Sequence, residues 1–188
     1  GYYFPELSGQ YSRNEIHLLR EARTDVWHAI NQAESHHPHM RNYLQICVDH
    51  GMDPTDASYA YFLLPNRTPE QMNTYASSPN MEILENSQEA HAIIHHDLNL
   101  TGILCWVDGG KQVGSIGVNR KASVLIQNKN NQLDIAVADP TFRGGNVRVE
   151  IDLETEHMET IRPMNLDEGI KVVKPRPKLV LEVNTSLA

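Results

Sequence analysis

Arg23 and Trp27 are the residues of this chain whose types and spacing point most directly to ligand recognition. A guanidinium group pairs bidentately with a carboxylate, and the flat face of an indole ring stacks on a sugar ring. Because the two residues are four positions apart, a strand would place both side chains on one face. The alternative is that Trp27 lies in a hydrophobic core with Arg23 as its ion-paired neighbour.

Two short segments are rich in histidine, a common metal ligand, and are therefore candidate metal sites. These are the loop residues His36, His37 and His39 and the strand residues His91, His95 and His96. A structural zinc site requires four ligands in a fixed geometry, usually with cysteine among them. Neither segment supplies such a set, so we interpret them as solvated loop or edge histidines and predict no metal site.

Calcium is the cofactor that the sequence leaves open. Its ligands are oxygen atoms, and four acidic residues occur at predicted strand ends: Asp134, Asp139, Asp152 and Glu154. Their spacing is not that of an EF-hand, and backbone carbonyl ligands cannot be recognised in a sequence. We therefore predict no cofactor, with structural calcium as the alternative.

The charge balance restricts the partners that the chain can bind. The formal net charge is -8, so we expect neither nucleic acid nor an anionic membrane surface as a partner, because both require a basic footprint. An anionic polysaccharide would need a local basic cleft. The scattered candidates for such a cleft are Arg20, Arg23, Arg41 and Arg67.

Length and composition predict a packed globular chain. A length of 188 residues permits one large or two small domains, and 40% hydrophobic residues suffice for a core. No apolar run is long enough to predict a membrane helix. Cys47 and Cys105 both lie in apolar, strand-like runs, and we predict buried free thiols rather than a disulfide.

Apolar runs bounded by turn residues predict strands along most of the chain. Residues 57–64, rich in aromatic and branched side chains between two prolines, predict a strand covered on both faces. Further strands are predicted at residues 14–19 leading into 20–27, 43–48, 89–95, 102–107, 115–118, 122–127, 133–138, 146–151, 170–173 and 178–183. This close spacing favours antiparallel sheets.

Turn chemistry and one capping signal divide these strands. Glycine and asparagine predict hairpin loops at residues 108–110, 128–131 and 143–146. Prolines at 174–177 suit a sheet edge or connector. Thr68 as the N-cap and Pro69 as the first helical residue predict a short helix that ends at 77–79. We place a domain boundary there, between residues 1–79 and 80–188.

Several segments resemble polysaccharide lyase family 8, the group of hyaluronate, chondroitin AC and xanthan lyases. They are the opening Gly-Tyr-Tyr-Phe-Pro, the Arg-Glu-Ala-Arg-Thr run followed by Trp27, the Ala-Ser-Tyr-Ala-Tyr run followed by Leu-Leu-Pro-Asn, and residues 81–87, 100–102 and 136–141. Asp25 stands where this family usually has glycine. The resemblance covers roughly the first 150 residues.

The resemblance implies a fold and a chemistry. Residues 1–79 would be the end of a central β super-sandwich, and residues 80–188 a small C-terminal β-sandwich. The family cleaves uronic-acid-containing polysaccharides by β-elimination, which requires carboxylate neutralisation, a base and an acid. Its catalytic Asn, His, Tyr and Arg lie on a helical N-terminal domain, before the equivalent of Gly1. His50 and Tyr59 share two of these types, but we interpret them as scaffold and predict no catalytic residue.

We therefore expect a C-terminal fragment of a secreted or periplasmic polysaccharide lyase. By this hypothesis the fragment is inactive alone, supports the cleft formed with the absent helical domain, and contacts an acidic polysaccharide at the rim through Arg23 and Trp27. The alternative is a free-standing carbohydrate-binding module. The sequence does not distinguish hyaluronan, chondroitin and xanthan as substrates.

Overall fold

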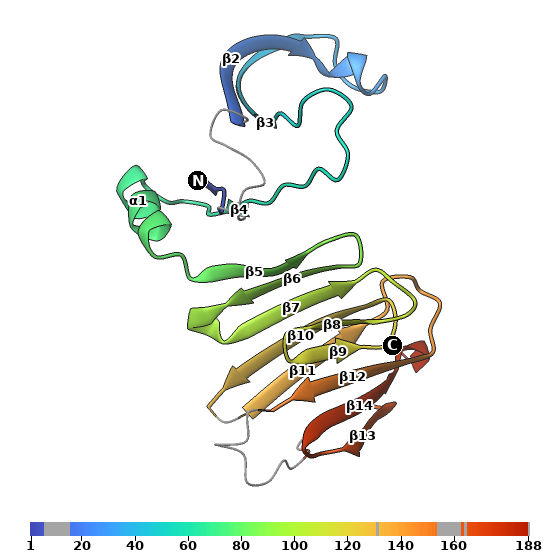
Figure 1. Ribbon diagram of the computed structural model, residues 1–188. Helices are drawn as coiled ribbons and strands as arrows, with labels where there is room; N and C mark the ends of the chain where they lie inside the picture. Colours follow the sequence, from blue (N-terminus) through green and yellow to red (C-terminus); the bar gives the residue numbers. More distant parts are fainter. Residues whose placement is uncertain (6–15, 131, 154–162, 164, 188) are drawn as a thin grey trace. The chain divides into compact units, whose positions relative to one another are not determined.

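The computed structural model describes residues 1–188 apart from 6–15, 131, 154–162, 164 and 188 (Figure 1). Contacts divide the chain into two compact units, Gly1–Asn73 and Thr74–Ala188. Within the described residues the strand pairs are antiparallel and one α-helix is present, so the predicted all-β fold is confirmed. The division at residue 79 stays a prediction.

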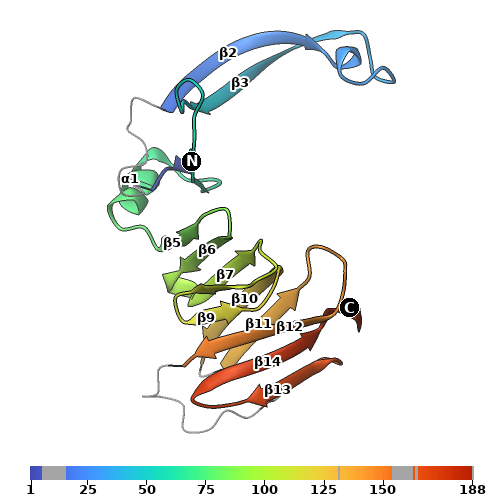
Figure 2. The ribbon, with the colours of Figure 1, turned by 45° about the vertical axis from the view of Figure 1, so that its right-hand side comes forward.

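A long hairpin is the main element of the first unit. Its strands, β2 (Ile16–Val26) and β3 (Pro38–Val48), pair along their whole length and curve together (Figure 2). The 3-10 helix η2 (Trp27–Ala29) and the turn after it connect them, with the His28 backbone N–H donating to the Ser35 carbonyl. The short strands β1 (Tyr2–Tyr3) and β4 (Phe62–Leu63) form a separate pair.

The predicted strand over residues 57–64 is wrong for most of its length. Only Phe62–Leu63 forms a strand, because Tyr2–Tyr3 is its only partner among the described residues. Phe62 is buried, but Tyr59, Tyr61 and Leu63 are exposed, so the expected cover on both faces is not found within this unit. The tyrosine rings contact one another instead, with the Tyr59 and Tyr61 centroids 6.5 Å apart and nearly parallel.

Helix α1 (Pro69–Ser77) forms where the capping signal predicts it. The Thr68 backbone N–H donates to Gln71 Oε1 at 2.9 Å, and the Gln71 backbone N–H donates to Thr68 Oγ1 at 3.3 Å. This reciprocal pair is a capping box, which satisfies two backbone donors that a helix start leaves free.

Two five-stranded sheets build the second unit. The first has the order β11 (Gln132–Ala138), β10 (Ala122–Lys129), β7 (Leu100–Cys105), β6 (Ala90–His95) and β5 (Met81–Asn86). The second has the order β13 (Ile170–Lys174), β14 (Lys178–Asn184), β12 (Asn146–Asp152), β9 (Ile116–Val118) and β8 (Lys111–Val113). Two 3-10 helices, η3 (His96–Leu98) and η4 (Thr185–Leu187), complete the unit.

The hydrophobic core lies between these two sheets, which face each other in Figures 1 and 2. Both sheets contribute side chains that alternate with outward-facing residues. The buried set includes Ile103, Cys105 and Val124 from the first sheet and Val118, Val147 and Val149 from the second. This closed β-sandwich follows the period-two pattern read from the sequence.

Two of the three predicted hairpin loops are wrong. The loop at residues 128–131 joins the adjacent strands β10 and β11, as predicted. The loops at 108–110 and 143–146 instead carry the chain from the first sheet to the second. Gly110, Gly144 and Gly145 supply positive φ, which a crossing between sheets needs as much as a hairpin does. Strands β5 and β8, at the sheet edges, were not predicted.

A buried carboxylate holds the crossing from β11 to β12. The Asp139 side chain is 2% exposed, and its Oδ1 accepts from the backbone N–H and the hydroxyl of Thr141 at 2.8 and 2.6 Å. Arg120 lies 3.4 Å from Asp139 Oδ2 and also donates to the Gly144 carbonyl. The bonds from Thr141, more than the Arg120 charge, lower the pKa of Asp139.

We expect Asp139→Asn to lower the Tm of the second unit in a pH-dependent way. A carboxyl with a depressed folded-state pKa stabilises the fold above its unfolded value, about 3.9, and that contribution is lost as pH falls through the folded value. The Tm difference between wild type and Asp139→Asn should therefore be largest near pH 7 and shrink below about pH 4. Calorimetry across this range measures it.

Asp152→Asn is the matched control, because Asp152 is half-exposed and pairs only with Lys178 among the described residues. This variant should change Tm little at any pH. A Tm difference for Asp139→Asn that stayed constant from pH 7 to pH 3 would contradict the assignment.

Candidate functional site

The β2–β3 hairpin has a polar face and a more apolar face, which also carries Arg20, Thr24 and Asn42. Side chains alternate along each strand, and residues opposite one another across an antiparallel pair share a face. The polar face holds Glu21, Arg23 and Asp25 of β2 and His39, Arg41 and Tyr43 of β3. The opposite face holds Leu18, Ala22 and Val26 with Met40, Leu44 and Ile46. Leu18, Met40 and Leu44 are exposed.

Arg23 and Arg41 lie directly opposite each other on the polar face. The Arg23 guanidinium lies over the Tyr43 ring, 4.5 Å from its centroid, and its Nε lies 3.4 Å from Glu21 Oε1 and 3.8 Å from Asp25 Oδ2. These ion pairs are exposed and therefore weak, so an incoming carboxylate can replace them. The two arginines and the two carboxylates leave this face close to neutral on a chain that is acidic as a whole.

Asp25 also takes part in this cluster. A hydrogen bond between Tyr43 and the Asp25 carboxylate is the main cause that raises the pKa of the Tyr43 hydroxyl. Asp25 thus orients the ring on which Arg23 lies. The sequence analysis did not find the pairing of Arg23 with Arg41, although folding the chain back about residue 32 places position 41 opposite position 23.

Trp27 does not share a strand face with Arg23. It is the first residue of η2, one position beyond the end of β2, and it is 56% exposed. The alternative interpretation, that Trp27 is a core residue, is also wrong within the described part of the first unit. Its ring is accessible to a ligand, and its contact with substrate stays a prediction.

The described residues contain no group of three or more histidine, cysteine or acidic side chains arranged to hold a metal ion. The His28 and His36 rings contact each other, with centroids 3.5 Å apart. His91 accepts from Trp106 Nε1 at 3.4 Å, and His96 lies 3.1 Å from Glu82. The predicted absence of a metal stays a prediction.

The four candidate calcium ligands do not converge where the structure describes them. Asp134 accepts from Gln132, Asp139 accepts from Thr141, and Asp152 pairs with Lys178. Glu154 lies outside the described residues. Each described carboxylate thus already has a protein donor.

The two cysteines differ in burial. Both are free, and Cys105 is buried in the sandwich core as predicted. Cys47 is exposed, so its predicted burial is wrong. It lies on the polar face of the hairpin, opposite His17, where no described layer covers it.

His50 and Tyr59 are near each other in the first unit, with ring centroids 6.3 Å apart. Proximity alone does not make a catalytic pair, because β-elimination also requires a group that neutralises the uronate carboxylate. Their interpretation as scaffold stays a prediction.

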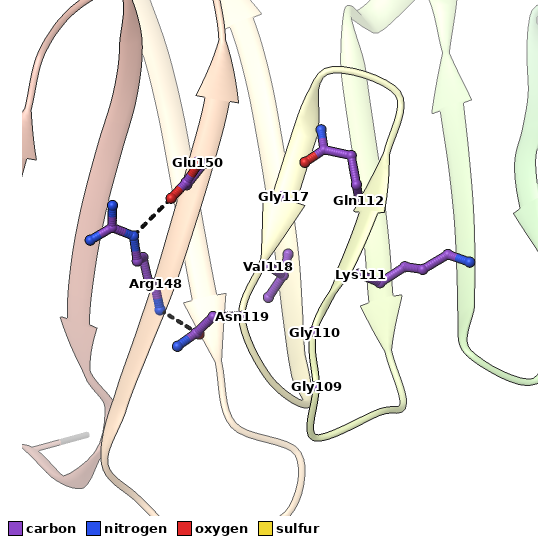
Figure 3. Close-up of a pocket in the computed structure, with 9 residues that line it drawn as sticks. All are labelled: Gly109, Gly110, Lys111, Gln112, Gly117, Val118, Asn119, Arg148 and Glu150. Atoms are coloured by element: carbon purple, nitrogen blue, oxygen red, sulfur yellow. Dashed lines mark hydrogen bonds and ion pairs between the residues drawn. The ribbon is translucent and has the colours of Figure 1, made fainter.

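The second unit carries an open trough of about 300 Å³ on the outer face of its second sheet (Figure 3). Gly117 of β9 forms the floor, Gln112 of β8 one wall, and Arg148 and Glu150 of β12 the other. The loop at Gly109 and Gly110 closes one end. The sequence analysis missed this feature, although a lone glycine inside a strand is a known sign of close approach by another group.

Residues 1–76 match the family model for the polysaccharide lyase family 8 super-sandwich domain, and residues 82–148 match that for its C-terminal beta-sandwich domain. A xanthan lyase of Bacillus sp. (strain GL1) is 33% identical over 99% of this chain and 19% of the relative. A hyaluronate lyase of Thermasporomyces composti is 29% identical over 97% of this chain and 22% of the relative.

Solved structures agree with these relatives. A Paenibacillus xanthan lyase superposes with a TM-score of 0.83 and 35% identity, covering 98% of this chain and 17% of the other. A Streptomyces coelicolor chondroitin AC lyase, 23% identical with a TM-score of 0.78 over 90% of this chain and 22% of the other, supports the fold alone. The chain spans about one fifth of the relatives it matches. The chain belongs to polysaccharide lyase family 8, of which it carries the C-terminal β portion.

Proposed function

We propose that the full-length protein depolymerises a uronic-acid-containing polysaccharide by β-elimination, and that this portion supports the substrate cleft without providing the catalytic groups. Membership in the family and the names of the relatives support the reaction class. The base, the acid and the carboxylate-neutralising groups are assigned to the remaining four fifths of the protein.

The observation that carries a direct role in substrate contact is the facing pair Arg23 and Arg41. Two like charges opposite each other on a hairpin destabilise it. Among the described residues, the exposed carboxylates of Glu21 and Asp25 pair with Arg23 and not with Arg41, so a further anion would stabilise the pair. A uronate carboxylate is such an anion, and a guanidinium fork binds it with defined geometry. We therefore assign the polar face of β2–β3 to the cleft rim, and Trp27 to stacking on an adjacent sugar ring.

The apolar face of the same hairpin supports the architectural role. Leu18, Met40 and Leu44 are exposed in the first unit, although side chains of this kind are usually covered in a sheet. We assign their cover to other strands of the super-sandwich in the full-length protein. The absent helical domain would be a further partner, and we propose a secreted or periplasmic location. No helix in the described ranges is long and apolar enough to cross a membrane.

An activity screen tests the proposed reaction. Full-length protein and the 188-residue chain are each incubated with hyaluronan, chondroitin and xanthan, and the unsaturated product is followed by its ultraviolet absorbance. We expect the full-length protein to release product from at least one polymer and the isolated chain to release none. A full-length protein inactive on all three, or an active isolated chain, would contradict the proposal.

The second candidate function is a free-standing carbohydrate-binding module. The trough on the second unit favours it, because that feature needs no other part of a lyase. Reading the coding frame upstream of Gly1 separates the two candidates. Several hundred residues with a helical, aromatic-rich domain support the lyase, whereas a stop or an unrelated domain supports the module.

A further inference from the structure

The trough on the second sheet contains a glycine, Gly117, whose missing side chain leaves room for the carboxamide of Gln112. Gln112, Gly117 and Glu150 lie opposite one another across three neighbouring strands, and their side-chain positions face outward because Val113, Val118 and Val149 point into the core. A Cβ on Gly117 would lie 2.6 Å from Gln112 Oε1. The Gln112 carboxamide therefore lies over Gly117, in space that a side chain at residue 117 would take.

The loop that closes one end also depends on a glycine. Gly110 has a φ of 76°, and a Cβ there would lie 2.3 Å from the Val118 carbonyl oxygen. Its backbone N–H donates to the Val107 carbonyl. The loop is thus held against the end of β9, and the trough is a preformed feature of the backbone.

Hydrogen-bond donors and hydrogen-bond acceptors both line the trough. Asn119 Oδ1 accepts from the Arg148 backbone N–H at 2.7 Å, and Arg148 Nε donates to Glu150 Oε1 at 2.8 Å. The described residues offer no partner within hydrogen-bond distance to Asn119 Nδ2, Glu150 Oε2 or the Arg148 Nη groups. Gln112 donates its amide to the Gly114 carbonyl and keeps Oε1 as an acceptor. Donors and acceptors therefore alternate around the trough.

The charges around the trough disfavour an anionic ligand. Arg148 is balanced by Glu150 and lies 3.9 Å from Glu182. Lys111 also lines the trough, but its side chain points away from Gly117 in Figure 3. Its amine pairs with Glu85 of β5 and with Glu89 in the turn between β5 and β6. Two carboxylates, Glu150 and Glu182, thus lie beside Arg148, so a uronate at the trough would meet a net negative charge.

We propose that this trough binds a neutral hexose unit of a polysaccharide, as a second saccharide site separate from the arginines of the hairpin. The hydroxyl groups of a pyranose both donate and accept, so they match alternating amide, guanidinium and carboxylate groups. The residues that line the trough include no aromatic ring, so the affinity is on the order of millimolar. This inference rests on the proposed function in one respect only, that the protein acts on polysaccharide.

Amide NMR of the ¹⁵N-labelled 188-residue chain tests the site without any lyase activity. Cellotetraose and mannotetraose serve as neutral probes and a hyaluronan tetrasaccharide as the acidic probe. We expect saturable shifts of the Gly110, Gly117 and Asn119 amides with at least one neutral probe, and weaker binding of the acidic one. No saturable shift with either neutral probe, or tighter binding of the acidic probe, would overturn the proposal.

Gly117→Ala and Gln112→Ala test the assignment of residues. The added Cβ of Gly117→Ala would displace the Gln112 carboxamide. We expect this variant to weaken binding roughly fivefold or more, and Gln112→Ala, which removes one acceptor from an exposed edge strand, to weaken it about threefold. Gly102→Ala is the matched control, because Gly102 is also a strand glycine and its added Cβ would make ordinary contacts at 3.6 and 3.9 Å. Unchanged binding in both trough variants would overturn the assignment. Neutral-sugar binding by a protein with no lyase activity would refute only the proposed reaction.

Discussion

In the full-length protein, Arg23→Ala is expected to lower kcat/KM on the uronic-acid polymer by about 10- to 100-fold. Removing one partner of a charge-assisted hydrogen bond costs about 1.5–3 kcal/mol, and each 1.4 kcal/mol corresponds to a factor of ten. Because Arg23 is placed at the rim rather than at the reacting atoms, most of the loss should appear in KM. Steady-state kinetics with the preferred polymer give both parameters.

Arg20→Ala is the matched control for this experiment. Arg20 is an exposed arginine of the same strand, but it lies opposite Leu44 on the other face of the hairpin. Its removal makes the same change in net charge and should leave KM nearly unchanged. Equal losses in the two variants would mean that general charge attraction, and not a carboxylate site at Arg23, explains the effect.

Arg23→Lys separates charge from geometry. A lysine keeps the positive charge but cannot form the bidentate pair or lie flat on the Tyr43 ring. We expect an intermediate KM. This variant also tests whether the contact with the Tyr43 ring matters. If the KM of Arg23→Lys equalled that of the wild type, only a point charge would be needed at this position.

The second unit could be predicted well from sequence because it encloses its own core. Its period-two patterns at residues 122–127 and 146–151 correspond to β10 and β12, whose inward side chains are covered by the facing sheet of the same unit. Local pattern and tertiary environment therefore agree. The pattern does not predict which sheet each strand joins. Glycine-rich turns, such as those at 108–110 and 143–146, occur in connections between two sheets as well as in hairpins.

Sequence reasoning was less successful in the first unit for a different physical reason. Residues 57–61 have the composition of a strand, and Cys47 and Trp27 have the character of buried residues, yet none of these expectations holds within Gly1–Asn73. A strand needs a partner backbone, and burial needs a covering layer. Composition records the preference of these residues but not where their partners lie.

The candidate site shows the same division between residue type and register. Arg23 could be predicted as a candidate because the residue type alone indicates that it can bind a carboxylate. Its relation to Arg41 and Tyr43 depends on the pairing of two strands separated by a turn, and a shift of one residue would have placed these side chains on the opposite face. Predicting the trough would require the register of three strands, because residues of β8, β9 and β12 line it.

Ile103→Ala is expected to lower the free energy of unfolding of the second unit by about 2–5 kcal/mol. Ile103 is 3% exposed on the inner face of β7, between Ala92 of β6 and Val124 of β10. These neighbours are small, and a truncated side chain would leave a cavity that they cannot fill without backbone movement. Urea unfolding of the 188-residue chain, followed by Trp106 fluorescence in a Trp27→Phe background, measures the change in this unit alone.

Ile93→Ala provides the matched comparison, because it makes the same truncation one step away in the same sheet. Ile93 pairs with Gly102 in the rung next to Ala92 and Ile103, but it points to the outer face and is 43% exposed. We expect a loss below about 1 kcal/mol. If Ile93→Ala lowered the free energy of unfolding as much as Ile103→Ala, the core would not lie between the two sheets. The trough could then not lie on the outer face of the second sheet.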